Sequence, residues 1–232
     1  AASDVYKRQH LTRGGALRRL VKSIGDGIAT LLVLPLIVGF TLARLVAPGR
    51  TDPSYQGYSQ LLSLPPGASG NFLRRAFYRH TLQRCSPACT ISFGTLFATP
   101  EAEIGNDVYI GPNCMIGHAT IGDDVMLGSD VDLLSGKRQH HFDRTDVPIR
   151  LQGGTFDRIH IGHDAWLGNG STVLCDIGAH AIVAAGAVVI KEVEESEIVG
   201  GNPARVIGHR GQAPAHLDDP ANLPMDTGAD TQ

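Results

Sequence analysis

An aliphatic residue followed by a small one returns about every six positions through the middle of the chain. A fixed period of six residues predicts a parallel β-helix, in which each unit is one short strand and one turn. The aliphatic side chain points inward, and Gly, Asn or Asp tolerates the backbone of the turn. The predicted inward residues are Ile104, Ile110, Ile116, Ile121, Leu127, Leu133, Ile161, Leu167, Val173, Ile177, Val183 and Val189.

The chain ahead of the repeats is apolar and basic. A basic segment over residues 7–22 precedes 17 uncharged residues from Gly27 to Ala43. A membrane-spanning helix needs about 20 apolar residues, and Pro35 would kink a helix near its centre. A spanning helix, a signal peptide and a kinked re-entrant or interfacial anchor all stay open, and the third is favoured.

The segments on either side of the repeats complete the predicted organisation. Residues 48–70 are rich in Pro, Gly and Ser and predict a loop. The following "NFLRRAFYRHTLQRC" has helical spacing and either packs on the main domain or lies on anionic lipid, or does both. We expect a membrane-associated segment over 1–50, a linker and amphipathic helix over 51–90, the repeat domain over 91–210 and a disordered tail over 211–232.

Composition adds two constraints. The 28 glycines fit a chain that makes a turn every few residues, and the four cysteines form no CxxC pair, which favours packed thiols over disulfides. Through Arg84 there are twelve Lys and Arg against three Asp and Glu, a balance of +9, and the remainder has a balance of −12. The two parts are therefore expected to meet different surroundings, and the acidic repeat domain argues against nucleic-acid binding.

The repeats, together with three other stretches, resemble the hexapeptide-repeat acyltransferases. These stretches are the interrupting loop "SGKRQHHFDRTDVPIRLQGG", the segment "IGHDAWLGNGSTV", and "AAGAVVIKEV" leading to "GGNPARVIGHR". The chain looks most like the sugar and polysaccharide O-acetyltransferases of the maltose, galactoside and capsule type. The resemblance implies a mainly β fold, a left-handed parallel β-helix of hexapeptide repeats, with a helical membrane-associated segment before it.

The catalytic residue is expected on the loop over residues 135–158, which breaks the period. Transfer from a thioester to a hydroxyl needs a base that titrates near neutral pH, and histidine suits this role. The resemblance implies that this histidine is His140, with His141 as the alternative. Asp143 or Asp146 can orient its imidazole, Asp143, Arg150 and Gln152 are candidates on the acceptor side, and no metal is expected.

The donor implied by the resemblance is acetyl-CoA, bound on the outside of the β-helix between two subunits of a homotrimer. Backbone groups of Asn169 and Ala185 match positions that hydrogen-bond the pantetheine, and Trp166 matches a wall of the site. Lys191 and Arg205 match residues near the nucleotide phosphates, and Arg210 can replace a basic residue that is Gly208 here.

These features predict an acetyl-CoA-dependent O-acetyltransferase for a sugar or lipid-linked sugar hydroxyl. N-acetylation of an amino sugar stays open, because the same base and donor would serve. A non-catalytic β-helical scaffold bound to membrane is the alternative of a different class. Acetyl-CoA is cytosolic, so the expected location is the cytoplasmic face of the membrane, held by a re-entrant or interfacial anchor.

Overall fold

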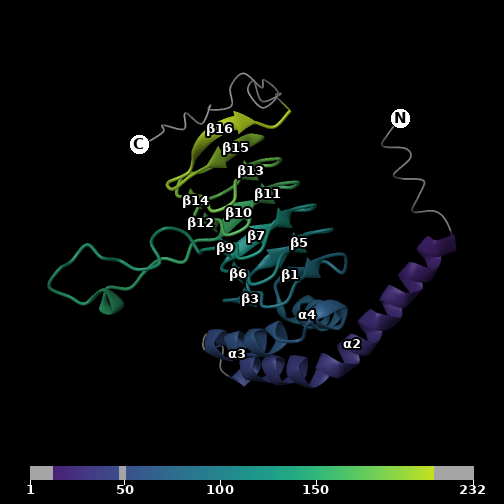
Figure 1. Cartoon of the computed structure of the whole chain (residues 1–232). Helices are drawn as coiled ribbons and strands as arrows, with labels where there is room; N and C mark the ends of the chain where they lie inside the picture. The colour runs from purple at the N-terminus through teal and green to yellow at the C-terminus, as the bar shows by residue number, and fades with distance from the viewer. Residues whose placement is uncertain (1–12, 47–50, 212–232) are drawn as a thin grey trace, which may run out of the picture.

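The chain forms a cap of three helices and a three-sided parallel β-helix that rises from it (Figure 1). The structure is a computed structural model that describes residues 13–46 and 51–211. Predictions for residues 1–12, 47–50 and 212–232, which include part of the basic segment, Arg50 and the tail, lie outside the described residues. The helices are α2 (Arg13–Val46), α3 (Thr51–Ser63) and α4 (Gly67–Thr81).

Three sheets form the sides of the β-helix, and successive strands pass from one sheet to the next. Sheet A contains β1 (Arg84–Cys85), β4 (Glu103–Ile104), β7 (Ala119–Ile121) and β10 (Ile159–Ile161). Sheet B contains β2 (Thr90–Ile91), β5 (Tyr109–Ile110), β8 (Met126–Leu127), β11 (Trp166–Leu167), β13 (Ile182–Val183), β15 (Glu197–Gly200) and the antiparallel β16 (Arg205–His209). Sheet C contains β3 (Leu96–Phe97), β6 (Met115–Ile116), β9 (Asp132–Leu133), β12 (Thr172–Val173) and β14 (Val188–Val189).

The core of the β-helix is the predicted aliphatic column. Each of the twelve predicted inward residues is at most 2% exposed, so this prediction is confirmed. Parallel pairing stacks them directly, as for Ile110 on Leu127 and Leu127 on Leu167. Because one unit cannot bury its own aliphatic side chain, the core exists only through this stacking.

Two corners of the prism are regular. From sheet A to B and from B to C, each inward residue is followed six positions later by the next, as in Ile104, Ile110 and Ile116. The residue three positions after the inward one adopts a left-handed backbone, as at Asp107 and Asn113. Asn, Asp and Gly enter that region at low cost, which explains why they recur at these turns.

The irregular steps all fall at the third corner, between sheets C and A. The step is seven residues from Phe97 to Ile104, five from Ile116 to Ile121, and four from Val173 to Ile177 and from Val189 to Val193. The loop over residues 135–158 also leaves the β-helix here. The period slips and the long insertion therefore mark one edge of the molecule.

The cap corrects one prediction made from the sequence. Residues 51–63, expected as part of a loop, form α3, so that expectation is wrong. Tyr55, Ser59 and Leu62 are buried at helical spacing, and the Ser59 hydroxyl accepts a hydrogen bond from the Phe97 backbone N–H at 2.8 Å. Packing on the first coil thus outweighs the turn-forming composition of the segment.

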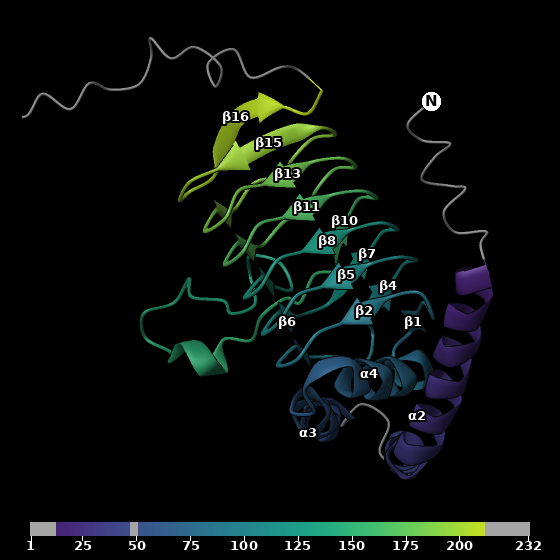
Figure 2. The same ribbon diagram turned by 45° about the vertical axis from the view of Figure 1, so that its right-hand side comes forward.

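Helix α4 lies directly beneath the first coil (Figure 2), and two of its arginines point inward. Of the alternatives for this segment, α4 packs on the main domain, and its Arg74 and Arg75 are buried, so these two arginines are not available to anionic lipid. Arg74 donates to the backbone oxygens of Ile91 at 2.7 Å and Pro65 at 2.8 Å. Burial lowers the pKa of Arg74 from its ordinary value.

Helix α2 continues through Pro35 without a turn, so the chain does not re-enter at this residue. It bends along the base of the cap and packs on α4 (Figures 1 and 2). A Cβ atom on Gly25 would lie 2.8 Å from the Phe72 ring, which shows how closely the two helices approach. Arg75 Nε donates to Asp26 Oδ1 at 3.1 Å and joins α2 to α4 by a partly buried ion pair.

The burial of Arg74 gives a test of the cap. Arg74→Met keeps the length of the side chain but leaves several buried carbonyl oxygens without a donor. We expect a loss of about 3–5 kcal/mol in the free energy of unfolding, measured by urea denaturation. Arg79→Met, at an exposed position of the same helix, is the control and should change it by about 0.5 kcal/mol or less. Equal stability of the two variants would contradict the role given to Arg74.

Candidate active site

The loop over residues 135–158 projects from the edge between sheets C and A (Figure 1). Its two arms run side by side near the root, where the Thr155 N–H donates to Arg138 O at 2.8 Å and the His141 N–H donates to Gly153 O at 2.9 Å. Lys137 Nζ donates to Ile190 O at 3.1 Å and fastens the root to a higher coil. The base of the loop is thereby held at a fixed place on the β-helix.

The two predicted candidates for the base have different surroundings on this loop. His140 is exposed. His141 is half-buried, and its Nε2 lies 3.4 Å from Thr155 Oγ1 on the opposite arm. The ring of His141 is thus engaged within the loop, while that of His140 faces outward.

The polar candidates on the same loop mostly contact one another. Asp143 Oδ2 lies 3.4 Å from Arg138 Nη2, and Asp146 pairs with Arg144. The carboxylates expected to orient an imidazole therefore pair with arginines in this structure. The Arg144 hydrogen bond holds the pKa of Asp146 below its ordinary value.

Gln152 also serves the loop, since its Nε2 donates to the backbone oxygens of Arg144 and Val147, each at 2.7 Å. These bonds close the far end of the loop around the short helix η1 (Ile149–Leu151). Arg150, in that helix, is exposed. Of the acceptor-side candidates, Gln152 is therefore bound to backbone and Arg150 is free to meet another molecule.

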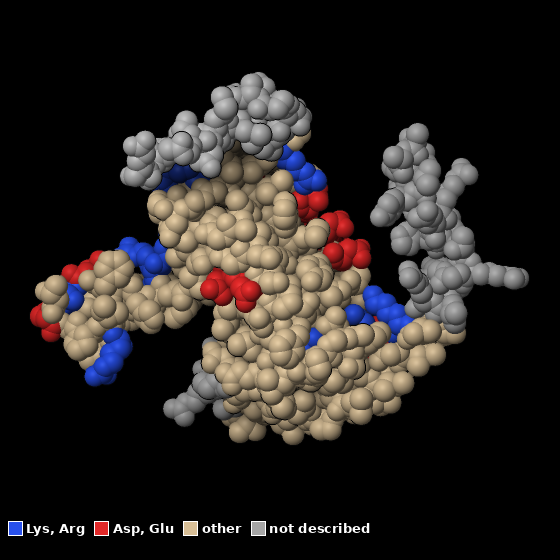
Figure 3. All heavy atoms as spheres, in the orientation of Figure 1, with Lys and Arg blue, Asp and Glu red and all other residues tan. Residues whose placement is uncertain are grey.

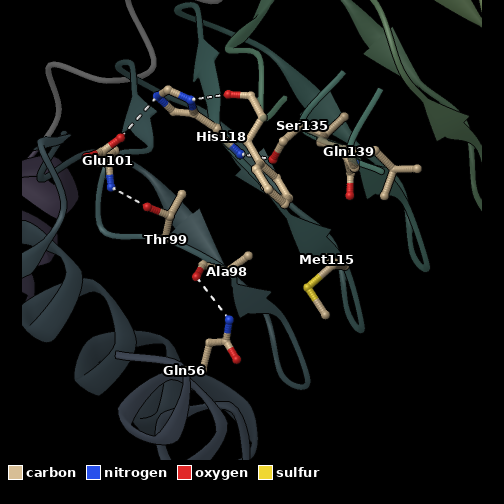
Figure 4. Close-up of a pocket in the computed structure, with 12 residues that line it drawn as sticks. Gln56, Ala98, Thr99, Glu101, Met115, His118, Ser135 and Gln139 are labelled. Carbon is tan, nitrogen blue, oxygen red and sulfur yellow. Dashed lines mark hydrogen bonds and ion pairs between the residues drawn. The ribbon is translucent and has the colours of Figure 1, made fainter. Parts of the chain in front are cut away.

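A hollow of about 480 Å³ lies at the root of the loop (Figure 4). Its walls come from α3, from three successive turns at the irregular corner, and from both arms of the loop. They are Gln56, Ala98, Thr99, Glu101, Met115, Gly117, His118, Leu133, Leu134, Ser135, Gln139 and Phe156. Gln139 directly precedes His140, which places the backbone of the predicted base next to this hollow, although His140 is not among its lining residues.

His118 and Glu101 are the titratable pair in the hollow, and sequence reasoning did not select them. His118 Nε2 lies 3.5 Å from Glu101 Oε2, while its Nδ1 lies 3.4 Å from Phe156 O. The His118 side chain is 21% exposed, although its position after Ile116-Gly117 is typical of a solvated turn. The five-residue step from Ile116 to Ile121 is the signal that marks this corner.

The donor-side candidates lie along a different edge. Trp166 points outward from sheet B and is 51% exposed. Asn169 and Ala185 occupy the same corner, between sheets B and C, one coil apart, and the Gly186 N–H donates to Asn169 O at 2.8 Å. Within one chain, sheet C separates this edge from the loop that carries His140 and His141.

Two of the basic candidates meet at the far end of the β-helix. Lys191 and Arg205 both line a hollow of about 130 Å³ there. Arg210 lies at the opposite end of β16, where its Nη1 is 2.8 Å from Asp164 Oδ2. The structure therefore does not bring Arg210 together with the other two.

Asp164 is the acceptor shared by two partners at this corner. His180 Nδ1 lies 2.9 Å from Asp164 Oδ2. This hydrogen bond holds the pKa of Asp164 below its ordinary value, and the hydrogen bond from Arg210 adds to the effect. His180 thus belongs to a local ion-pair cluster.

Among the residues that the structure describes, no three His, Cys, Asp or Glu side chains come together as metal ligands.

Comparison with known proteins agrees with the repeat and the fold. Residues 101–131 match the family model described as bacterial transferase hexapeptide (six repeats). The galactoside O-acetyltransferase of Escherichia coli is 30% identical over 128 residues, which are 52% of this chain and 58% of that enzyme. The chain spans 23% to 62% of the length of the curated relatives compared.

Solved structures give the same fold at lower identity. A maltose O-acetyltransferase from Clostridium difficile superposes with a TM-score of 0.60 and 19% identity, over 69% of this chain and 88% of that one. A galactoside acetyltransferase in complex with coenzyme A gives a TM-score of 0.52 and 20% identity, over 70% and 84% of the two chains. The chain is thus a β-helical protein of bacterial transferase hexapeptide repeats that resembles the hexapeptide-repeat acetyltransferases in sequence and in fold.

Proposed function

We propose that the chain is an acetyl-CoA-dependent O-acetyltransferase that modifies a sugar hydroxyl. The observation that supports this most is the loop, which carries the exposed His140 directly after Gln139, a residue that lines a hollow large enough for a saccharide unit. The relatives named galactoside and maltose O-acetyltransferase, and a galactoside acetyltransferase structure with coenzyme A, support acetyl-CoA as the donor and a sugar as the acceptor.

The reaction is a direct transfer in a ternary complex. The acceptor oxygen attacks the thioester carbonyl carbon while His140 takes the hydroxyl proton, and backbone N–H groups stabilise the oxyanion. The C–S bond then breaks, and the thiolate of coenzyme A receives the proton from the imidazolium. The products are the acetyl ester and the free thiol, so no metal and no covalent enzyme intermediate are required.

His140 suits the role of base better than His141. A general base must reach the hydroxyl with a free ring nitrogen, and the His140 side chain is exposed. The ring of His141 lies against Thr155. In the hollow, His118 and Glu101 offer hydrogen bonds to other hydroxyls of the acceptor, as do Gln56 and Gln139.

A homotrimer would bring the loop of one copy to the donor-side edge of the next. The outward side chains of sheet B support such an assembly, because they form an apolar column along the β-helix. This column consists of Tyr109, Met126, Trp166, Ile182 and Ile198, aligned by strand register. Sheet A instead presents Arg84, Glu103, Thr120 and His160 outward, which suits a face that meets water.

We further propose that the cap holds the enzyme at the cytoplasmic face of a membrane, for the synthesis of a membrane-associated polysaccharide. Helix α2 is apolar enough to contact a bilayer, with a mean hydropathy of 2.1 over Leu20–Val46. Because it lies along the cap, an interfacial position fits better than a span. Cytosolic acetyl-CoA requires the β-helix to stay on that side.

Two other functions would use parts of the same architecture. An N-acetyltransferase for an amino sugar would use the same base and donor, and it differs only in making an amide product. A scaffold without activity would leave the loop histidine without a role. Release of the coenzyme A thiol on addition of acceptor separates enzyme from scaffold, and mild alkaline lability of the product separates ester from amide.

His140→Ala should lower kcat by about 10²–10⁴, because the hydroxyl proton then has no acceptor in the transition state. Binding of acetyl-CoA, measured by calorimetry, should change little. His141→Ala is the matched control on the adjacent residue and should keep most of the activity. An active His140→Ala together with an inactive His141→Ala would transfer the role to His141.

Met126→Glu should dissociate the trimer, because it places a charge in the apolar column of sheet B without entering the core. Light scattering should then give the mass of a monomer, and activity should be lost, since each donor site needs two copies. His160→Glu introduces the same side chain on exposed sheet A and should leave the trimer intact. A fully active monomer would refute the shared site.

A further inference from the structure

Helix α2 leaves one whole face without a partner among the residues that the structure describes. Ala29, Val33 and Phe40 are buried against the cap. The opposite face is exposed at helical spacing over about seven turns, and it includes Leu31 at 70% and Leu42 at 55% exposed. Its large apolar members are Leu20, Val21, Ile24, Ile28, Leu31, Leu32, Leu34, Val38, Leu42, Leu45 and Val46, here called the α2 stripe.

The chemistry of α2 suits lipid as the occupant of this stripe. The hydroxyls of Thr30 and Thr41 donate to the carbonyl four residues earlier, each at 2.8 Å, so neither needs water. Asp26, which is the only acid of α2, pairs with Arg75. Exposed basic residues border the stripe at Lys22, Arg44 and Arg79, where they can meet anionic headgroups.

Charge on the surface follows the same division. On the face that Figure 3 draws, the lower part of the cap shows almost no acidic side chains and has basic ones at its border, while acidic ones lie higher on the β-helix, where basic ones also occur. An anionic bilayer therefore attracts the base and repels the sides. This arrangement places the β-helix upright on the membrane, with α2 lying in the interface.

The hollow at the root of the loop lies close to this base. Gln56 of α3 forms part of its wall, and Gln56 Nε2 donates to Ala98 O at 3.4 Å. On its other side α3 packs on α2, where the ring centroid of Phe40 lies 5.2 Å from that of Tyr55 and 6.2 Å from that of Tyr58. One helix layer, about 8–10 Å between axes, thus separates the hollow from the helix that carries the stripe.

We infer that the acceptor is a saccharide attached to a membrane lipid, taken from the bilayer on which α2 lies. The lipid headgroup layer is about 5–7 Å thick on each side of the hydrocarbon core. A sugar on a phosphate-containing or glycerol headgroup projects beyond that layer, to the height of the hollow. This inference rests on the proposed function and selects the acceptor class within it.

The test follows radiolabelled acetyl groups and works for any acceptor sugar. The full chain is incubated with [¹⁴C]acetyl-CoA and with two extracts of the source cells. One is the total lipid fraction, reconstituted in vesicles that contain phosphatidylglycerol, and the other is the water-soluble saccharide fraction. We expect at least a tenfold excess of label in the lipid fraction, at matched sugar content.

A double variant separates the α2 stripe from the active site. Leu31→Glu with Leu42→Glu changes two exposed side chains and should leave the thermal melting curve nearly unchanged. It should stop co-sedimentation with the vesicles and lower labelling of the lipid fraction at least tenfold. Ile207→Glu, at an exposed apolar position on β16 at the opposite end of the β-helix, is the control and should behave as the unmodified chain.

The remaining outcomes count against the inference in distinguishable ways. Label mainly in the water-soluble fraction overturns the lipid-linked acceptor and leaves the acetyltransferase function intact. Undiminished lipid labelling by the double variant overturns the role of the α2 stripe. A change of oligomeric mass in the double variant, without vesicle binding by the unmodified chain, would assign the stripe to contact between copies. Label in neither fraction would overturn the proposed function itself.

Discussion

The guanidinium of Arg74 joins the first coil of the β-helix to α3 and α4. The first coil of a β-helix has no coil beneath it, so its open end must be covered. Arg74, fully buried, donates to Ile91 O in that coil, to Leu62 O at the end of α3, and to Asn71 Oδ1 within α4. Its neighbour Arg75 holds α2 through Asp26. Because α3 supplies Gln56 to the hollow, Arg74 fixes the wall of the site while Arg75 fixes the helix of the base.

The regular corners of this prism differ from the corner that forms the hollow at the root of the loop. Two corners repeat a six-residue step, with a left-handed residue at most of their turns. At the third corner the step varies from four to seven residues and includes the long loop, so successive turns cannot cover one another. The hollow with His118 and Glu101 forms where they fail to do so. Departure from the period is thus the physical origin of the cavity.

Sequence predicted the elements that depend on local period, and it missed those that depend on contacts across the fold. The twelve inward residues and the projecting loop follow from a count of positions, and both are found. Helix α3 was missed because its buried face, which includes Tyr55 and Leu62, is defined by contact with the first coil of the β-helix, and the sequence does not show this contact. His118 looked like a solvated turn residue because Glu101, at the same corner one coil earlier, is brought to it by stacking. The inward direction of Arg74 was hidden for a similar reason, since its acceptors are backbone carbonyls, which a sequence does not display.

The charge balance of +9 over residues 1–84 overstates the electrostatic contribution to any membrane contact. Two of its arginines are buried inside the cap, and among the basic residues around α2 whose burial the structure describes, Lys22, Arg44 and Arg79 are exposed. At about 1 kcal/mol for each basic residue close to anionic lipid, these three contribute about 3 kcal/mol. A single Leu or Ile side chain contributes about 1.5–3 kcal/mol when fully buried from water, and the α2 stripe exposes several of each. Apolar burial therefore dominates, salt weakens it little, and the basic residues serve mainly to orient the base toward the bilayer.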